Sequence, residues 1–218
     1  MSTLQTLRDA VRINKQKIDP NGRVWADSEV DTAIKQAVTQ IQQDGDYNWH
    51  FNDAENSQNT VVSTGTYALP DGFVRIEKGT VKYNGQPLLP RDYGWLKRNN
   101  TTLAVDGNSS VYYLRGNNIG LFQRPNDIKV LEFLYRKKLA TMAADASDSG
   151  MESDFDEAIV QYASYMLWSV IQGRNDNAIS AIQNYKQAME GLNAQYLGRR
   201  DDADFSFKFE TIQDYSSF

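Results

Sequence analysis

The hydrophobic residues change their spacing twice along the chain, and this change limits the possible folds most strongly. Near both ends they recur every three or four residues, which is the spacing of one face of an α-helix. Between about Thr60 and Tyr135 they occur in short segments rich in Val, Ile, Tyr, Thr and Phe, broken by turn pairs such as Asn84-Gly85, which is typical of strands joined by turns. We therefore expect an α+β fold, in which a helical bundle from the N- and C-terminal helices carries an inserted antiparallel β region.

Four helices are expected in the bundle. The first runs from Thr3 to Lys17, and the second begins at an N-cap on Asp27 or Ser28 and ends at Asp44-Gly45. A third begins with Ser153 as N-cap and extends to Ile171, and a fourth runs from Asp176 to Gly198. The expected strands are Thr60–Ala68, Val74–Tyr83, Pro87–Leu89, Val111–Arg115, Ile119–Gln123 and Ile128–Arg136.

These elements divide the chain into three parts. Residues 1–46 and 150–198 are expected to form the helical bundle, residues 60–138 the β insertion, and residues 199–218 an extended C-terminal tail.

Composition removes several classes of function. The 218 residues include no Cys and a single His, His50, which excludes disulfides, thiolate metal sites, a thiol nucleophile and any site with several His ligands. The 23 Lys and Arg against 28 Asp and Glu give a net charge of -5, which argues against a dedicated nucleic-acid binder. The N-terminal residues 1–19 have no apolar core of a secretion signal, and no segment is long enough to span a bilayer. We therefore expect no cofactor, no metal and no membrane partner.

The C-terminal tail is the most informative segment. Phe205, Phe207 and Phe209 alternate with polar residues, so their rings would share one face of an extended chain. The apolar character continues in Ile212, Tyr215 and Phe218, and the charged pair Arg199-Arg200 precedes the segment. Such rings favour burial, either on this protein's own sheet or on a partner through strand addition.

Four other features suggest chemistry only weakly. Residues 145–156 have acidic residues at the first and last positions of a calcium loop and Gly at the sixth, but Ser occupies the third and fifth positions. The acidic residues from Glu152 to Glu157 are explained by the start of a helix, and His50 lies among aromatic residues that predict packing. Basic residues at Lys97-Arg98 and at Arg136, Lys137 and Lys138 are candidates for an electrostatic channel lining, an interface or a solvated strand edge.

Four strings, in their order along the chain, resemble the bacteriophage head-to-tail connector adaptor proteins, the neck components attached to the portal. They are Trp25–Val30, Tyr67–Ile76, Gly116–Pro125 and Phe155–Ala163. The resemblance spans most of the chain, and the departure from the family is a β insertion longer than in the minimal helical adaptors.

The resemblance implies a virion structural protein with no catalytic residues, assembled in the host cytoplasm and located in the neck between capsid portal and tail. It implies a homo-oligomeric ring, of twelve copies, that binds the portal through its C-terminal tail and offers a platform to tail or nozzle proteins. DNA would only pass through such a ring, without specific binding, past a mildly negative wall.

Two other functions remain open from the sequence. One is a surface-binding module whose β region recognises a glycan or receptor through Tyr93, Trp95, Tyr112 and Tyr113. The other is a carboxylate-dependent hydrolase, which requires an acidic pair in a cleft with one raised pKa.

Overall fold

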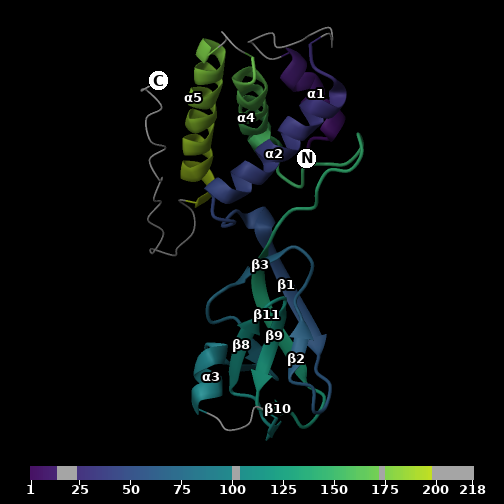
Figure 1. The fold of residues 1–218 in the computed structure, drawn as a ribbon, viewed down its shortest axis with the longest axis vertical. Coiled ribbons are helices and arrows are strands. Elements are labelled where there is room, and N and C mark those ends of the chain that lie inside the picture. The colour runs from purple at the N-terminus through teal and green to yellow at the C-terminus, as the bar shows by residue number, and fades with distance from the viewer. Residues whose placement is uncertain (14–23, 100–103, 172–174, 198–218) are drawn as a thin grey trace.

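Helices and strands occupy opposite ends of an elongated molecule (Figure 1). The computed structural model describes residues 1–13, 24–99, 104–171 and 175–197. The helices α1, α2, α4 and α5 lie together at one end, and the strands lie with the short helix α3 at the other (Figure 1). The fold is mixed α+β, as the change in hydrophobic spacing predicts.

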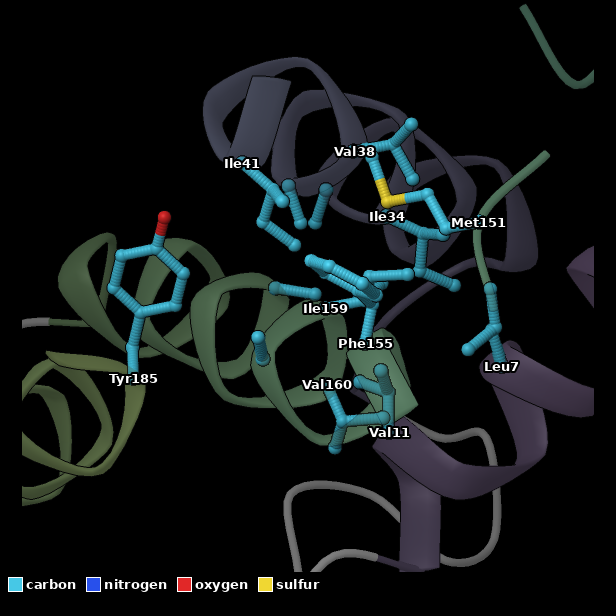
Figure 2. Close-up of a cluster of buried hydrophobic side chains, with 14 of the residues drawn as sticks. Leu7, Val11, Ile34, Val38, Ile41, Met151, Phe155, Ile159, Val160 and Tyr185 are labelled. Atoms are coloured by element: carbon cyan, nitrogen blue, oxygen red, sulfur yellow. The ribbon is translucent and has the colours of Figure 1, made fainter. Parts of the chain in front are cut away.

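The helical end is built around one apolar core. Helices α1 (Leu4–Ile13), α2 (Asp27–Asp44), α4 (Asp156–Ser169) and α5 (Asn175–Leu192) each bury the face that carries their periodic apolar residues. Figure 2 shows these side chains pointing toward one another from different helices, with Phe155 and Ile159 near the centre. Short turns flank the helices: the 3-10 turns η1 (His50–Asn52) and η2 (Ser153–Phe155), and the π-helical turn η3 (Asn193–Leu197).

The segment before η2 caps helix α1. The backbone N–H groups of Leu4 and Gln5 donate to the carbonyls of Ser147 and Asp145, at 2.9 and 3.2 Å. Arg8 on the next turn holds both Asp31 of α2 and Asp145, at 2.7 and 2.6 Å, and these carboxylates raise the pKa of its guanidinium. The residues that resembled a calcium loop therefore attach the first helix to the bundle, and Asp156 at its end accepts a hydrogen bond from Ser2.

The β end contains two larger sheets and one small one. The five-stranded sheet has the order β1-β11-β4-β5, with β3 also paired to β11, and the four-stranded sheet has the order β2-β9-β8-β6. The strands are β1 (Asp53–Asn59), β2 (Thr66–Ala68), β3 (Phe73–Ile76), β4 (Lys82–Tyr83), β5 (Gln86–Pro87), β6 (Leu89–Pro90), β7 (Asp106–Gly107), β8 (Val111–Arg115), β9 (Asn118–Phe122), β10 (Arg124–Pro125) and β11 (Val130–Lys137). Their inner faces form a second core that includes Tyr83, Leu121 and Phe133.

Most pairs in these sheets are antiparallel, as expected, but two are not. β6 pairs with β8 in parallel, and β10 pairs with β7 in parallel. Each of these pairings is only two residues long, so the turn dipeptides in the sequence do not reveal it.

Three strand predictions were wrong in their bounds. Only the last three residues of the expected strand Thr60–Ala68 are a strand, and the chain forms β1 earlier, from Asp53 to Asn59. The expected strand Val74–Tyr83 is divided into β3 and β4, because Gly79 takes a positive φ of 80° at a turn between them. The short expected strand Pro87–Leu89 is likewise divided between β5 and β6.

Two helix starts also differ from the predictions. Ala26 rather than Asp27 or Ser28 occupies the N-cap of α2, where its backbone N–H donates to Glu29 Oε2 at 2.8 Å. Ser153 begins the 3-10 turn η2 instead of capping α4 through its hydroxyl. The ends predicted at Lys17 and Gly198 lie outside the described residues.

Candidate functional site

The predicted docking residues of the tail lie beyond the last described helical turn. Arg199, Arg200, Phe205, Phe207, Phe209, Ile212, Tyr215 and Phe218 all fall outside the described residues. The last described element before them is the turn η3, which continues α5 over residues 193–197.

Tyr196 attaches this turn to the body of the protein. Its hydroxyl donates to a pair of carboxylates, at 2.6 Å from Glu152 Oε2 and 2.7 Å from Asp154 Oδ2. Its ring stacks on His50 with 5.3 Å between centroids and also contacts the buried Phe155 at 5.5 Å. We call Tyr196, His50, Glu152 and Asp154 the tail anchor, since their contacts hold the last described turn, directly before the residues that are predicted to form the tail.

The Tyr196 hydroxyl and the carboxylates of the tail anchor shift one another's pKa. The Tyr196 hydroxyl lowers the pKa of Glu152, and the contact of Glu152 with His50 Nε2, at 2.9 Å, acts in the same direction. The two carboxylates in turn raise the pKa of the Tyr196 phenol. The prediction that His50 packs in an aromatic cluster is confirmed, since it contacts Phe51 as well as Tyr196.

A buried polar network joins the bundle to the β end. Gln42, near the end of α2, accepts hydrogen bonds on Oε1 from Asn52 Nδ2 at 3.1 Å and from the backbone N–H of Leu139 at 2.8 Å. Asn52 also donates to the carbonyl of Lys137 at 2.8 Å. Beside it, Arg75 of β3 donates to Asp46 Oδ2 and Asn48 Oδ1, at 2.7 and 2.8 Å. We call this set the waist, because the chain enters the β end after Asn52 and leaves it at Lys137.

The basic triplet at the end of β11 is divided between different roles. Arg136 is buried and forms ion pairs with Asp53 and Glu77, so its charge is balanced by carboxylates of this protein. Lys137 is half-buried, and Lys138 is exposed and donates its backbone N–H to the carbonyl of Gly72 at 2.8 Å. The triplet therefore lies at the waist. Of its three cations, Lys137 is partly exposed and Lys138 is exposed.

The aromatic residues considered for glycan stacking are not all accessible. Tyr112 and Tyr113 are each only 8% exposed and lie within the four-stranded sheet, and burial raises the pKa of both phenols. Trp95 is 39% exposed, whereas Tyr93 is half-buried and has Arg115 and Lys97 over its ring at 4.6 and 5.7 Å. The four rings therefore do not form one open stacking surface.

The carboxylates show two opposite shifts. The pKa of Asp156 is raised mainly by burial, while Ser2 donates to it. Glu152, whose pKa is lowered, belongs to the tail anchor. In the described part of the chain no three acidic or His residues converge as they would around a metal ion. No described helix is long and apolar enough to cross a membrane.

Sequence reasoning missed both the tail anchor and the waist. The spacing of apolar residues in the last expected helix gives Tyr196 a packing role only, although an acidic pair two residues apart, Glu152 and Asp154, is visible in the sequence. Gln42 and Asn52 are polar residues without a distinguishing pattern, so nothing in their spacing predicts their burial.

Comparison with known proteins agrees with the proposed resemblance at the level of the family. No curated protein matches the chain. A family model described as SU10 adaptor protein matches residues 2–207, which is nearly the whole chain and covers both the helical and the β end. The chain therefore belongs to the SU10 adaptor protein family and is a structural adaptor of a bacteriophage virion.

Proposed function

We propose that this protein is the adaptor of a head-to-tail connector: a non-enzymatic subunit that binds the portal as a ring and holds the tail below it. Its partners would be the portal protein, tail or nozzle proteins and further copies of itself, twelve in the ring, at the neck of the virion. DNA would pass through the ring without specific contacts. Family membership supports an adaptor role, and the contacts of the last described turn support the finer assignment.

The tail anchor is the observation that carries the proposal. Tyr196 is held through its hydroxyl by two carboxylates and through its ring by His50 and Phe155, so the residues after it start from a fixed point on a folded body. A segment with alternating Phe residues that starts from a fixed point can reach one defined groove or strand edge on a partner. With 21 residues after Leu197, an extended segment spans at most about 70 Å.

The waist supports the proposal that the protein holds the tail below the portal. A protein that joins two partners must hold them in a fixed orientation relative to each other. A flexible hinge between its helical end and its β end would allow that orientation to change. Gln42, Asn52 and Arg75 connect α2 and η1 to β3 and β11 by hydrogen bonds that are buried or partly buried. The β end is therefore held at a set angle to the bundle. Lys137 and Lys138 at the waist remain our candidates for contact with passing DNA or a neighbouring subunit.

Portal binding by tail variants tests this function. Deleting residues 203–218 should leave a folded protein, by circular dichroism, that no longer co-sediments with purified portal rings. Replacing Phe205, Phe207 and Phe209 by Ala should give the same loss, since these rings share one face of an extended segment. The matched control replaces Ser206 and Lys208 by Ala on the opposite face and should keep binding. Full portal binding by the deletion variant would refute the proposal.

A further inference from the structure

An exposed cluster of cations and aromatic rings surrounds helix α3 (Tyr93–Asn99) at the far end of the β region (Figure 1). The Arg91 guanidinium lies over the Trp95 ring at 4.8 Å, and Arg115 of β8 lies over Tyr93 at 4.6 Å. Rings hold cations in place without neutralising them. We call this surface the α3 patch; its members are Arg91, Tyr93, Trp95, Lys97, Arg98 and Arg115.

The arginines of the α3 patch differ from the other arginines of the described chain. Outside the patch, every arginine in the described residues forms an ion pair with a carboxylate: Arg8, Arg12, Arg75, Arg124 and Arg136. Within the described residues, Arg91, Arg98 and Arg115 have no carboxylate at ion-pair distance. The nearest acid in sequence, Asp92, accepts the backbone N–H of Trp95 at 2.9 Å and so caps α3. Among the described residues, the arginines without a carboxylate partner therefore lie together in the α3 patch.

A surface of the opposite character lies on the five-stranded sheet. A shallow hollow there is lined by Asp53, Glu55 and Glu77 around Leu134, which is 39% exposed. Arg136 lies between Asp53 and Glu77 and supplies one cation for two carboxylates. Glu55 is exposed and lies directly opposite Leu134 in the β1–β11 register. We call this surface the β1 hollow; it combines an apolar floor with an acidic rim.

We propose that the α3 patch of one copy docks on the β1 hollow of the next copy. Trp95 would cover the apolar floor at Leu134, while the cations around it meet the carboxylates of the rim. Trp and Arg are the residue types most enriched at the energetic centres of interfaces. The inference rests on the ring in the proposed function, and it names the lateral contact that builds it.

The position of the two surfaces fits a repeating contact. Helix α3 lies along one edge of the β region and β1 along the other, left and right in Figure 1. Because the two surfaces differ, the contact is heterologous: each copy uses its α3 patch on one side and its β1 hollow on the other, and repetition gives a ring when the rotation closes. A polyanion such as DNA would match the cations alone, whereas a second copy also explains the acidic hollow with its apolar floor.

Charge reversal in the full-length protein tests the contact. Arg91→Glu places a negative charge of the patch against the acidic rim, and Glu55→Arg places a positive charge of the rim against the cations of the patch, so each change weakens the attraction between the two surfaces. Each variant alone should self-associate at least about tenfold more weakly than the wild type in sedimentation at low salt. An equimolar mixture of the two should recover association, because each variant then offers the surface that the other needs. Lys186→Glu, an exposed reversal on α5, is the control and should behave as the wild type.

Cysteine pairing detects the same contact when association is weak. The chain contains no Cys, so the introduced thiols are the only ones in a mixture of Arg91→Cys and Glu55→Cys. Under mild oxidation this mixture should yield several times more mixed dimer than Arg91→Cys with Lys186→Cys. Equal yields, or a charge-reversed mixture that stays dissociated, would overturn the proposal. So would an Arg91→Glu protein that loses binding to duplex DNA, by fluorescence anisotropy, while its self-association is unchanged. These experiments need no portal, so their failure is distinct from failure of portal binding.

Discussion

Gln42 and Asn52 meet in the interior of the waist, where the Asn52 amide donates to Gln42 Oε1 at 3.1 Å. Both side chains are almost inaccessible, at 4% and 0% exposure. The same Gln42 oxygen accepts the backbone N–H of Leu139, and the Gln42 amide donates back to the carbonyl of Val38 at 3.1 Å. One side chain at the end of α2 thus connects the segment that enters the β end with the segment that returns from it.

Replacing Gln42 by Ala should therefore destabilise the protein and loosen the waist. The change removes the acceptor of two buried donors, and an unsatisfied buried donor costs about 1–3 kcal/mol. Gln43→Ala, its exposed neighbour on the same helix, should change the free energy of unfolding by less than about 0.5 kcal/mol. Urea unfolding measures both. Hydrogen exchange at Leu139 should also become faster in Gln42→Ala, and equal stability of the two variants would show that the network is not structural.

The two separate apolar cores predict separable effects of core substitutions. Phe155 is fully buried in the helical core, edge to face with Trp49 at 5.0 Å, and Phe133 is 2% exposed in the β core. Truncating either to Ala should cost about 3–5 kcal/mol. Hydrogen exchange should accelerate mainly in the helices for Phe155→Ala and mainly in the strands for Phe133→Ala. Uniform acceleration in both variants would instead indicate that the two ends unfold as one unit.

The parts of the fold that the sequence predicts well are those in which one element buries its own apolar residues. Helix α2 ends at Asp44 and strand β8 spans Val111–Arg115, both as expected, because their patterns are strong and their ends carry turn residues. Strand β1 was missed because its inward residues include Asn56 and Gln58, and the apolar side chains of that layer come from its partner β11. Helix α3 was missed because it is short and contains Gly94, although Asp92 in capping position was a usable signal.

The site was harder to predict than the fold, for a physical reason. Tyr196, His50 and Glu152 are far apart in sequence and come together only because Tyr196 of η3 contacts His50 of η1 and Glu152 directly before η2. Arg136 was expected among exposed cations. It is instead buried, because Asp53, its partner in the β1–β11 register, forms an ion pair with its guanidinium. Such contacts depend on register and helix packing, which a single sequence does not encode in any local pattern.

Gly120 provides a test of packing in the four-stranded sheet. It lies opposite Tyr113 in the β8–β9 register, and a Cβ at this position would be 2.2 Å from Tyr113 Cζ. Gly120→Ala should therefore displace the ring and cost about 1–3 kcal/mol. Gly191→Ala in α5 is the matched control: nothing lies within 4 Å of its added Cβ, and it should stabilise the helix by about 0.5–1 kcal/mol. Thermal unfolding should show shifts of opposite sign, and a stabilising Gly120→Ala would contradict the close ring contact.

Tyr196→Phe should raise the pKa of Glu152 toward its ordinary value of 4.5. The reason is that the lost hydroxyl is the main group that stabilises the charged carboxylate. Because the folded-state pKa of Glu152 is lowered, this contact stabilises the tail anchor above the ordinary pKa and is lost as the pH falls through the folded-state value. In the wild type, acidification should therefore release Tyr196 from Glu152, and NMR titration of the Glu152 carboxyl measures the shift. Tyr165→Phe, whose ring contacts Tyr162 on α4, should leave the Glu152 titration unchanged. An unaltered Glu152 pKa in Tyr196→Phe would mean that the Tyr196 hydroxyl does not stabilise the Glu152 carboxylate.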